Sequence, residues 1–156
     1  MDLESMNNEP TEVSVISGYF NPIHVGHVRL MQGAKAVAGY LIVIVNNDRQ
    51  QQAKKGRIIM SEEDRLEVAS AMKSVDEAFV AVDDDESVAE SLSLIRGRYP
   101  NASITFCNGG DRSAVERLPG KESAACEELG IRMLYGVGGE DKPDSSTRIN
   151  AALGIE

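Results

Sequence analysis

The sequence has few of the residues that would direct it to a membrane, a metal site or a nucleic acid. Apolar residues make up 42% of the chain, yet none of their runs approaches the roughly 20 residues that a membrane-spanning helix needs. Cys107 and Cys126 lack metal-ligand spacing, so we expect two buried thiols without chemistry. Only 16 basic residues stand against 25 acidic ones, for a net charge of −9. This charge disfavours nucleic acid and anionic lipid as partners.

The amino-terminal residues also lack the basic and apolar parts of a secretory signal. Residues 1–12, MDLESMNNEPTE, are polar and acidic, which predicts a flexible lead-in and a cytoplasmic protein. At 156 residues and 16.9 kDa, the chain has the size of one domain. We therefore predict a single domain over residues 13–156 with one site. If its ligand is an anion, local groups must attract it.

Short apolar runs alternate with segments of helical spacing along the chain. Buried strands are predicted at 13–17, 40–45, 78–82, 103–107 and 131–135. Helical patterns separate them and close the chain, at 28–38, 62–72, 88–99, 123–129 and 144–154. Runs without polar alternation are typical of strands that are covered on both faces. The sequence thus predicts an α/β, Rossmann-like, doubly wound parallel sheet of five strands with helices on both faces.

Three segments between these elements carry local signals. Ser61 and Asp64 have capping-box spacing at the start of the second helix, and Ser87 and Glu90 have it at the start of the third. Residues 46–57, NNDRQQQAKKGR, are polar and lack periodicity, so we expect a mobile loop with several cations.

The only two histidines of the chain lie three residues apart in SGYFNPIHVGHVRL, residues 17–30. This segment joins the first strand to the first helix, at the edge of a parallel sheet where ligands bind. We expect Gly18 to let a ligand approach the backbone, Pro22 to stiffen the turn and Gly26 to allow tight packing. His24 and His27 at a helix start can direct donors into one volume, where free N–H groups also meet anions. The pattern favours a phosphate chain.

Two other interpretations of the histidines remain. Each imidazole can simply fill space or bond a carbonyl group, which is the ordinary case for a lone histidine. The pair can also bind a metal together with a carboxylate, although the chain has no third histidine and its cysteines lie far along the sequence. The coincidence of both histidines with Gly26 and a strand-to-helix turn favours the phosphate interpretation.

The segment GYFNPIHVGH, residues 18–27, resembles the G-x-F-D-x-x-H-x-G-H signature of the cytidylyltransferase-like nucleotidyltransferase superfamily. Asn21 stands where many members carry aspartate, and asparagine followed by proline occurs in nicotinate mononucleotide adenylyltransferases. Further segments are similar to glycerol-3-phosphate cytidylyltransferases and to the adenylyltransferase domain of ADP-heptose synthases: LIVIVNND (41–48), EEDRLEVASAMKSVDEAFV (62–80), NGGDR (108–112) and SSTRI (145–149). The resemblance extends over about residues 13–153.

This resemblance implies transfer of a nucleoside monophosphate from ATP or CTP to a small phosphorylated alcohol or sugar, with release of pyrophosphate. The acceptor attacks the α-phosphorus in line, so the protein needs no nucleophile of its own. Magnesium is expected with the nucleoside triphosphate, held by phosphate oxygens and water rather than by a protein site. Relatives often form homodimers. The alternatives are a mononucleotide adenylyltransferase of cofactor synthesis and a nucleotide-binding regulatory module without turnover.

The resemblance also implies roles for individual residues. His24, His27 and Lys54 are the catalytic candidates, and Lys55 or Arg57 could replace Lys54. The nucleotide-binding candidates are these histidines and lysines with Gly18, Tyr19, Phe20, Asn21, Gly26, Gly109, Gly110, Asp111, Ser145, Ser146 and Thr147. Possible acceptor or phosphate contacts are Arg57, Arg65 and Arg112.

Several of these residues have a plainer interpretation. The cations of 54–57 fit a solvated loop, NGGDR (108–112) fits a glycine turn, and 145–147 fits ordinary helix capping next to Asp144. Arg65 fits an exposed residue paired with Glu62 or Asp64. The segment GGEDKPDSST lacks the arginine that glycerol-3-phosphate cytidylyltransferases carry there, and Lys142 is an uncertain substitute.

Overall fold

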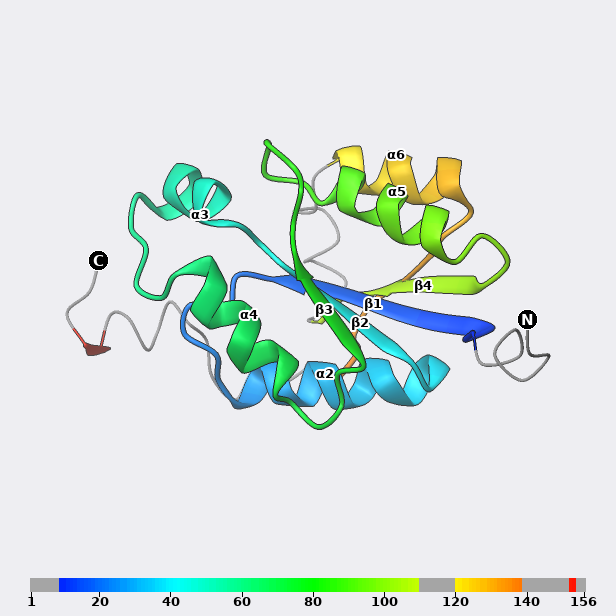
Figure 1. The fold of residues 1–156 in the computed structure, drawn as a ribbon, viewed down its shortest axis with the longest axis horizontal. Helices are drawn as coiled ribbons and strands as arrows, with labels where there is room; N and C mark the ends of the chain where they lie inside the picture. Colours follow the sequence, from blue (N-terminus) through cyan, green and yellow to red (C-terminus); the bar gives the residue numbers. More distant parts are fainter. Residues whose placement is uncertain (1–8, 110–119, 139–151, 154–156) are drawn as a thin grey trace, which may run out of the picture.

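The computed structural model describes residues 9–109, 120–138 and 152–153, the side chain of Lys55 excepted. Within them the chain forms one parallel sheet in the order β3-β2-β1-β4-β5 (Figure 1). The strands are β1 (Glu12–Gly18), β2 (Leu41–Val45), β3 (Glu77–Val80), β4 (Ser103–Cys107) and β5 (Arg132–Leu134). All five predicted strands are confirmed.

Helices cover both faces of this sheet. They are α2 (Val25–Ala38), α3 (Asp48–Lys55), α4 (Glu62–Ser70), α5 (Ala89–Arg98) and α6 (Gly120–Leu129). Helices α2 and α4 lie on one face and α5 and α6 on the other, as Figure 1 shows. The predicted doubly wound α/β class is therefore confirmed. No helix in the described ranges is long and apolar enough to cross a membrane.

The β-branched residues of the strands fill two cores, one on each face. Val13 and Val15 pack with α5 and α6, whereas Ile16 packs with α2 and α4. All five residues of β2 are fully buried, because its two neighbours and both helix layers exclude water from it. The thiols of Cys107 and Cys126 are free and buried in these cores, as the sequence predicts.

Helix α2 lies unusually close to the segment that follows β5. A Cβ atom on Gly33 would lie 2.8 Å from the backbone nitrogen of Gly138, and one on Gly138 would lie 2.9 Å from the backbone of Arg29 and Leu30. Gly138 also has a φ of 84°, a left-handed conformation that glycine adopts without strain. These two glycines allow backbone to pack on backbone beside the helix that begins at the histidines.

We predict that Gly33→Ala destabilises the protein by about 1–3 kcal/mol, because the added methyl group must displace backbone rather than a flexible side chain. The matched control is Gly97→Ala in α5, where an added Cβ meets nothing within 4 Å. That change removes glycine from an exposed helix and should stabilise by about 0.5–1 kcal/mol. Urea unfolding of the two variants measures both effects, and equal shifts would contradict the close packing of α2.

Two local predictions are wrong. The segment 46–57 is not a loop throughout, since α3 occupies most of it, with Asn47 as N-cap and Gly56 as C-cap. The predicted capping box of Ser87 and Glu90 is also not formed. Helix α5 begins one residue later, and the carboxylate of Asp83 accepts from the N–H groups of Glu90 at 2.7 Å and Ser91 at 3.1 Å. Tertiary contact places a stronger acceptor at this helix start than the local serine.

Other local predictions agree with the structure or fall outside it. The Ser61 hydroxyl accepts from the Asp64 N–H at 3.2 Å and caps α4. The final predicted helix, 144–154, lies almost entirely outside the described residues. The single domain over 13–156 and the lead-in over 1–12 stay predictions.

Candidate functional site

The candidate site lies where the sheet changes direction. Strands β1 and β4 are neighbours, but the chain leaves β1 toward α2 on one face and leaves β4 toward α6 on the other. The loops after these two strands therefore diverge at the carboxyl edge, which is where open α/β sheets bind ligands. The histidine segment follows β1 at this point, as the sequence predicts.

Both histidines take part in the start of α2. His24 is the N-cap residue, and its Nδ1 accepts from the Gly26 N–H at 3.0 Å. His27 Nδ1 accepts in turn from the His24 N–H at 3.1 Å, which completes a reciprocal capping box. An accepting Nδ1 carries no proton, so the proton of each neutral ring is on Nε2. The two rings lie side by side, with centroids 4.0 Å apart.

The environment keeps His27 neutral. Burial, and to a lesser extent the neighbouring His24, lowers its pKa from 6.5 to about 4. At neutral pH this ring is thus a hydrogen-bond donor through Nε2 without a positive charge. The capping role was not predicted from the sequence: Nδ1 of each ring caps the helix start, whereas Nε2 carries the donor proton.

The Phe20 ring packs against the histidine pair. Its side chain is only 2% exposed, and its ring meets the His27 ring edge-on with centroids 4.9 Å apart. The residue has a φ of 54°, and a Cβ on Gly18 would lie 2.8 Å from its ring. A side chain at position 18 would therefore collide with the Phe20 ring. The structure explains Gly18 by the space that this ring needs, whereas the sequence suggested the approach of a ligand.

Lys54 reaches the same segment from α3. Its Nζ lies 4.8 Å from the centroid of the half-buried Tyr19 ring, a cation–π contact. Lys55 ends α3, and Arg57 is exposed beyond the C-cap with its carbonyl oxygen accepting from Gln51 at 3.2 Å. Lys54 is therefore a cation that the structure brings to the histidine segment.

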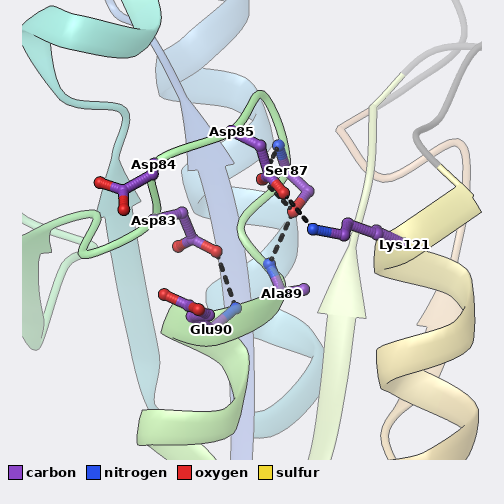
Figure 2. A pocket seen from close by; sticks show the side chains of 7 residues that line it. All are labelled: Asp83, Asp84, Asp85, Ser87, Ala89, Glu90 and Lys121. Atoms are coloured by element: carbon purple, nitrogen blue, oxygen red, sulfur yellow. Dashed lines mark hydrogen bonds and ion pairs between the residues drawn. The ribbon is translucent and has the colours of Figure 1, made fainter.

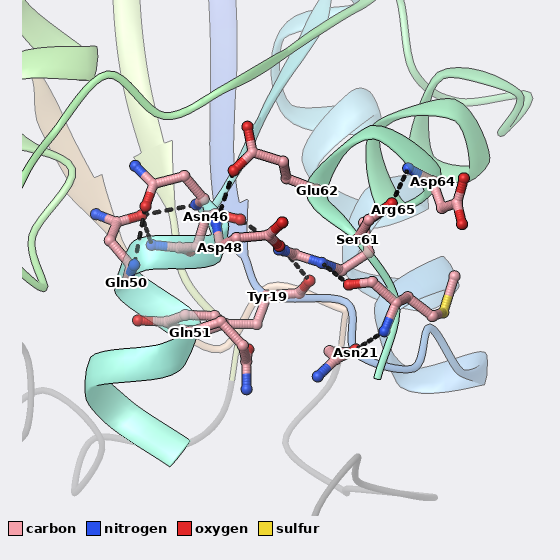
Figure 3. A network of polar contacts seen from close by, with 12 residues as sticks. Tyr19, Asn21, Asn46, Asp48, Gln50, Gln51, Ser61, Glu62, Asp64 and Arg65 are labelled. Atoms are coloured by element: carbon pink, nitrogen blue, oxygen red, sulfur yellow. Dashed lines mark hydrogen bonds and ion pairs between the residues drawn. The ribbon is translucent and has the colours of Figure 1, made fainter. Parts of the chain in front are cut away.

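Arg65 has a role that the sequence did not predict. Its side chain is fully buried rather than exposed, so the pairing with Glu62 or Asp64 is wrong. The guanidinium donates to the carbonyl oxygens of Met60, Tyr19 and Asn46 and to the carboxylate of Asp48 (Figure 3). These four acceptors are all protein atoms and use four of the five N–H groups of a fully buried guanidinium.

Asn21, the residue that departs from the usual aspartate, also faces the protein. It is 4% exposed, and its Oδ1 accepts from the Met60 N–H at 2.8 Å. Asn21 therefore holds the segment before α4 against the loop after β1 (Figure 3). A carboxylate oxygen could accept the same bond, so the substitution leaves this contact possible.

The sequence reasoning also missed a network of amide side chains around the start of α3. Gln50 accepts from the side chain of Asn46 at 3.0 Å and donates to the carbonyl oxygens of Asp85 and Ser87. Asn47 donates to the carbonyl oxygens of Ala81 and Asp83. The network fastens α3 to the segment after β3. The sequence does contain a signal for this helix start, because Asn47 and Gln50 have capping-box spacing.

The glycine loop after β4 is described only at its start. The backbone of Asn108 forms hydrogen bonds with Leu134 and Val137. A Cβ atom added to Gly109 would lie 3.7 Å from the Leu30 side chain. The loop therefore leaves the sheet beside α2, at the edge that carries the histidines. The remaining candidates lie outside the described residues: Gly110, Asp111, Arg112, Lys142, Ser145, Ser146 and Thr147.

A pocket of about 270 Å³ opens at the segment after β3, with Lys121 of α6 on its far side (Figure 2). Three of its carboxylates, those of Asp83, Asp84 and Asp85, have partners within the protein. Asp83 accepts from α5, and Asp85 pairs with Lys121 and Ser87, which lower its pKa to about 2. The lining includes four acidic residues and one lysine. This acidic lining disfavours a triphosphate in the pocket.

The described residues contain no group of three or more His, Cys, Asp or Glu side chains that could hold a metal ion. A magnesium ion that arrives with a triphosphate needs only phosphate oxygens and water as its main ligands. The Nε2 donors beside the start of α2 suit the phosphate oxygens of such a complex.

The fold is an α/β domain with its candidate site at the start of α2, at the carboxyl edge of the sheet. Residues 15–118 match the cytidylyltransferase-like family. Since this match covers about two thirds of the 156 residues, the chain belongs to the cytidylyltransferase-like family of nucleotidyltransferases.

Individual relatives agree with this membership. An FAD synthase of Ferroglobus placidus is 42% identical over 82 residues, which are 53% of this chain and 52% of the relative. The bifunctional protein HldE of Desulfatibacillum aliphaticivorans is 31% identical over 149 residues, 94% of this chain and 28% of the relative. The chain thus spans about half the length of the first relative and about a quarter of the second.

A solved structure supports the fold. The lipopolysaccharide core biosynthesis protein of Thermoplasma volcanium has a TM-score of 0.57 and 22% sequence identity, over 83% of this chain and 98% of that one. At this identity the similarity concerns the fold alone.

Proposed function

We propose that the chain transfers a nucleoside monophosphate from ATP or CTP to a small phosphorylated alcohol or sugar, with release of pyrophosphate. One observation carries the proposal. Two adjacent imidazoles at the start of α2 each accept a backbone N–H through Nδ1, which commits each Nε2 to donation. Paired neutral donors beside a helix N-terminus suit a polyphosphate.

In this reaction the acceptor oxygen attacks the α-phosphorus while the bond to pyrophosphate breaks. Negative charge grows on the oxygens of the departing pyrophosphate, and donors fixed in advance stabilise it without reorganisation. His24 and His27 supply such donors, because their Nδ1 bonds to the backbone fix the ring orientation. Lys54 adds a point charge from α3.

Magnesium, when bound with the triphosphate, neutralises charge on the phosphate oxygens. The chain's own residues do not need to form its coordination sphere, in keeping with the described side chains around the histidines.

A second candidate function is adenylyl transfer in cofactor synthesis. The 42% identity to an FAD synthase favours it, although that match covers only 53% of this chain. Its acceptor would be a mononucleotide such as FMN, the phosphorylated half of FAD. The similarity to the HldE protein, which extends over 94% of the chain, favours a sugar phosphate instead.

Pyrophosphate release tests the function directly. The purified chain is incubated with magnesium, each nucleoside triphosphate, and in turn glycerol 3-phosphate, sugar 1-phosphates, FMN or nicotinate mononucleotide. Release with a phosphorylated alcohol or sugar supports the proposal, and release with a mononucleotide alone supports the second candidate. Tight nucleotide binding without release in any mixture would contradict both and favour a regulatory module.

We predict that Lys54→Ala weakens binding of a non-hydrolysable triphosphate by about tenfold or more, the usual size of a lost charged hydrogen bond. Calorimetric titration with magnesium and an ATP or CTP analogue measures the effect. Lys54 is exposed, so its replacement by alanine should leave the fold intact. Unchanged affinity would move the role to Lys55 or Arg57.

A further inference from the structure

Arg65 joins four parts of the chain at the carboxyl edge of the sheet. Its Nε donates to the Met60 carbonyl at 2.9 Å, one terminal nitrogen donates to Tyr19 at 2.8 Å and Asn46 at 2.6 Å, and the other donates to Asp48 at 2.8 Å. Figure 3 shows the guanidinium between the loop after β1, the end of β2 and the start of α3. One side chain thus connects every segment around the histidine loop on this side of the sheet.

Such an arrangement costs free energy, because a fully buried guanidinium loses its hydration. An apolar residue would fill the same volume without that cost. The planar fork of arginine, however, fixes the directions of several acceptors at once, which an apolar side chain cannot do. The geometry therefore indicates a function in orientation rather than in stability alone.

Arg65 binds both segments whose side chains form the Lys54–Tyr19 contact, namely the loop after β1 and helix α3. The guanidinium binds the backbone carbonyl of Tyr19 and, through Asp48, the first turn of α3. Lys54 lies at the other end of this helix, with its Nζ 4.8 Å from the Tyr19 ring. Because α3 is short, its first turn sets the direction in which Lys54 projects.

Other contacts of α3 hold only its amino-terminal end. The Asp48 N–H donates to Glu62 at 2.9 Å, and Asn47 and Gln50 bind the segment after β3. None of these reaches the histidine loop. Within the described residues, Arg65 is the side chain that bonds both Asp48 of α3 and the Tyr19 carbonyl oxygen. A less direct route runs from Gln50 through Asn46 to the Gly18 carbonyl oxygen, before the histidine loop.

We infer that the Arg65–Asp48 ion pair is a positioning device that holds Lys54 of α3 over the histidine loop, ready to bind the triphosphate. The inference rests on the proposed function. It replaces the expectation that Arg65 itself contacts phosphate.

A double-mutant cycle tests the inference. Affinity for a non-hydrolysable ATP or CTP analogue with magnesium is measured in the wild type, Asp48→Ala, Lys54→Ala and the double variant. We expect Asp48→Ala to weaken binding about tenfold in the wild type and less than about twofold when Lys54 is absent, because coupled residues are not additive. Equal losses in both backgrounds, or no loss in the wild type, would overturn the inference.

The control is Asp84→Ala. It changes the net charge by the same amount and breaks the exposed pair of Asp84 with Arg49, which also lies on α3 but does not touch Arg65. Its affinity should equal that of the wild type. A loss as large as that of Asp48→Ala would overturn the inference, because charge alone would then explain the effect.

Stability is measured for each variant by urea unfolding. If Asp48→Ala does not fold, Asp48→Asn takes its place. It removes the charge of the ion pair but keeps an acceptor for Arg65, so we expect a smaller loss of affinity that still disappears when Lys54 is absent, and no loss in the wild-type background would overturn the inference. If Lys54→Ala alone leaves affinity unchanged, the inference falls with the role of Lys54. The proposed nucleotidyl transfer is judged separately by pyrophosphate release.

Discussion

His27→Ala should lower turnover about 10²–10³-fold, the loss typical when one fixed donor to a transition state is removed. The physical reason is that His27 is neutral, with its proton on Nε2, and lies within 4.0 Å of the His24 ring, measured between centroids. Steady-state pyrophosphate release at saturating nucleotide measures the effect. The alanine variant also loses the bond to the His24 N–H, which costs about 1 kcal/mol of stability.

Two further variants separate the donor from the cap. In His27→Asn the short amide oxygen can still accept from the His24 N–H, but no atom reaches the position of Nε2. We expect near-normal stability with turnover as low as in the alanine variant. In His27→Gln the longer amide reaches further and can donate, so part of the turnover should return. Wild-type turnover in His27→Asn would show that the ring serves only as a cap.

The second large effect concerns the stability of the fold. Glu122 of α6 is only 5% exposed and accepts from the Val88 N–H at 3.2 Å, at the start of α5. Burial raises the pKa of its carboxyl group from 4.5 to about 7, and the charges of Asp83 and Asp85 raise it too, whereas the Val88 bond and Lys54 lower it. The folded protein thus binds this proton more tightly than the unfolded chain.

The sign of the pH dependence follows from this shift. Below about pH 4.5 the Glu122 carboxyl group is protonated in both the folded and the unfolded protein, so its ionisation does not lower the free energy of unfolding. As the pH rises from about 4.5 to about 7, the unfolded chain releases this proton while the folded protein keeps it, so stability falls; above about pH 7 the fold must bury the charge and the loss is complete. Glu122→Gln avoids this loss and keeps an acceptor for Val88. It should stabilise the protein at pH 8 by up to about 3 kcal/mol, and much less at pH 5.

Urea unfolding at pH 5 and pH 8 measures the difference. The matched control is Glu128→Gln, an exposed residue of the same helix, whose effect should stay within about 0.5 kcal/mol at both pH values. A Glu122→Gln variant with the same stability increment at both pH values would contradict the buried carboxyl.

The fold was predictable because its strands are nearly uniform in apolar and β-branched residues. Runs such as 13–17 and 41–45 have no polar face, so only a sheet covered on both sides can bury them. The position of His24 and His27 was predictable for a related reason. The first strand must be followed by a turn at the carboxyl edge, and glycine and proline mark that turn.

The parts that were missed depend on tertiary contact. Helix α3 has no apolar face to reveal it, since bonds from Asn47 and Gln50 to distant carbonyl groups hold it. Arg65 follows an acidic run and looks exposed, yet the loops after β1 and β2 enclose it. The raised pKa of Glu122 arises from packing between α5 and α6. These contacts join residues that lie far apart in the sequence, so no local sequence pattern reveals them.

Nitrogen–proton correlation NMR of the imidazoles tests the role of the two histidines most directly. The chain has only two histidines, so four ring nitrogens account for the whole spectrum, and His27→Asn assigns them. We predict that both rings carry their proton on Nε2 in the ligand-free protein, and that both Nε2 signals shift when a non-hydrolysable triphosphate and magnesium are added. A proton on Nδ1 of either ring, or Nε2 signals that stay in place at saturating nucleotide, would contradict the account.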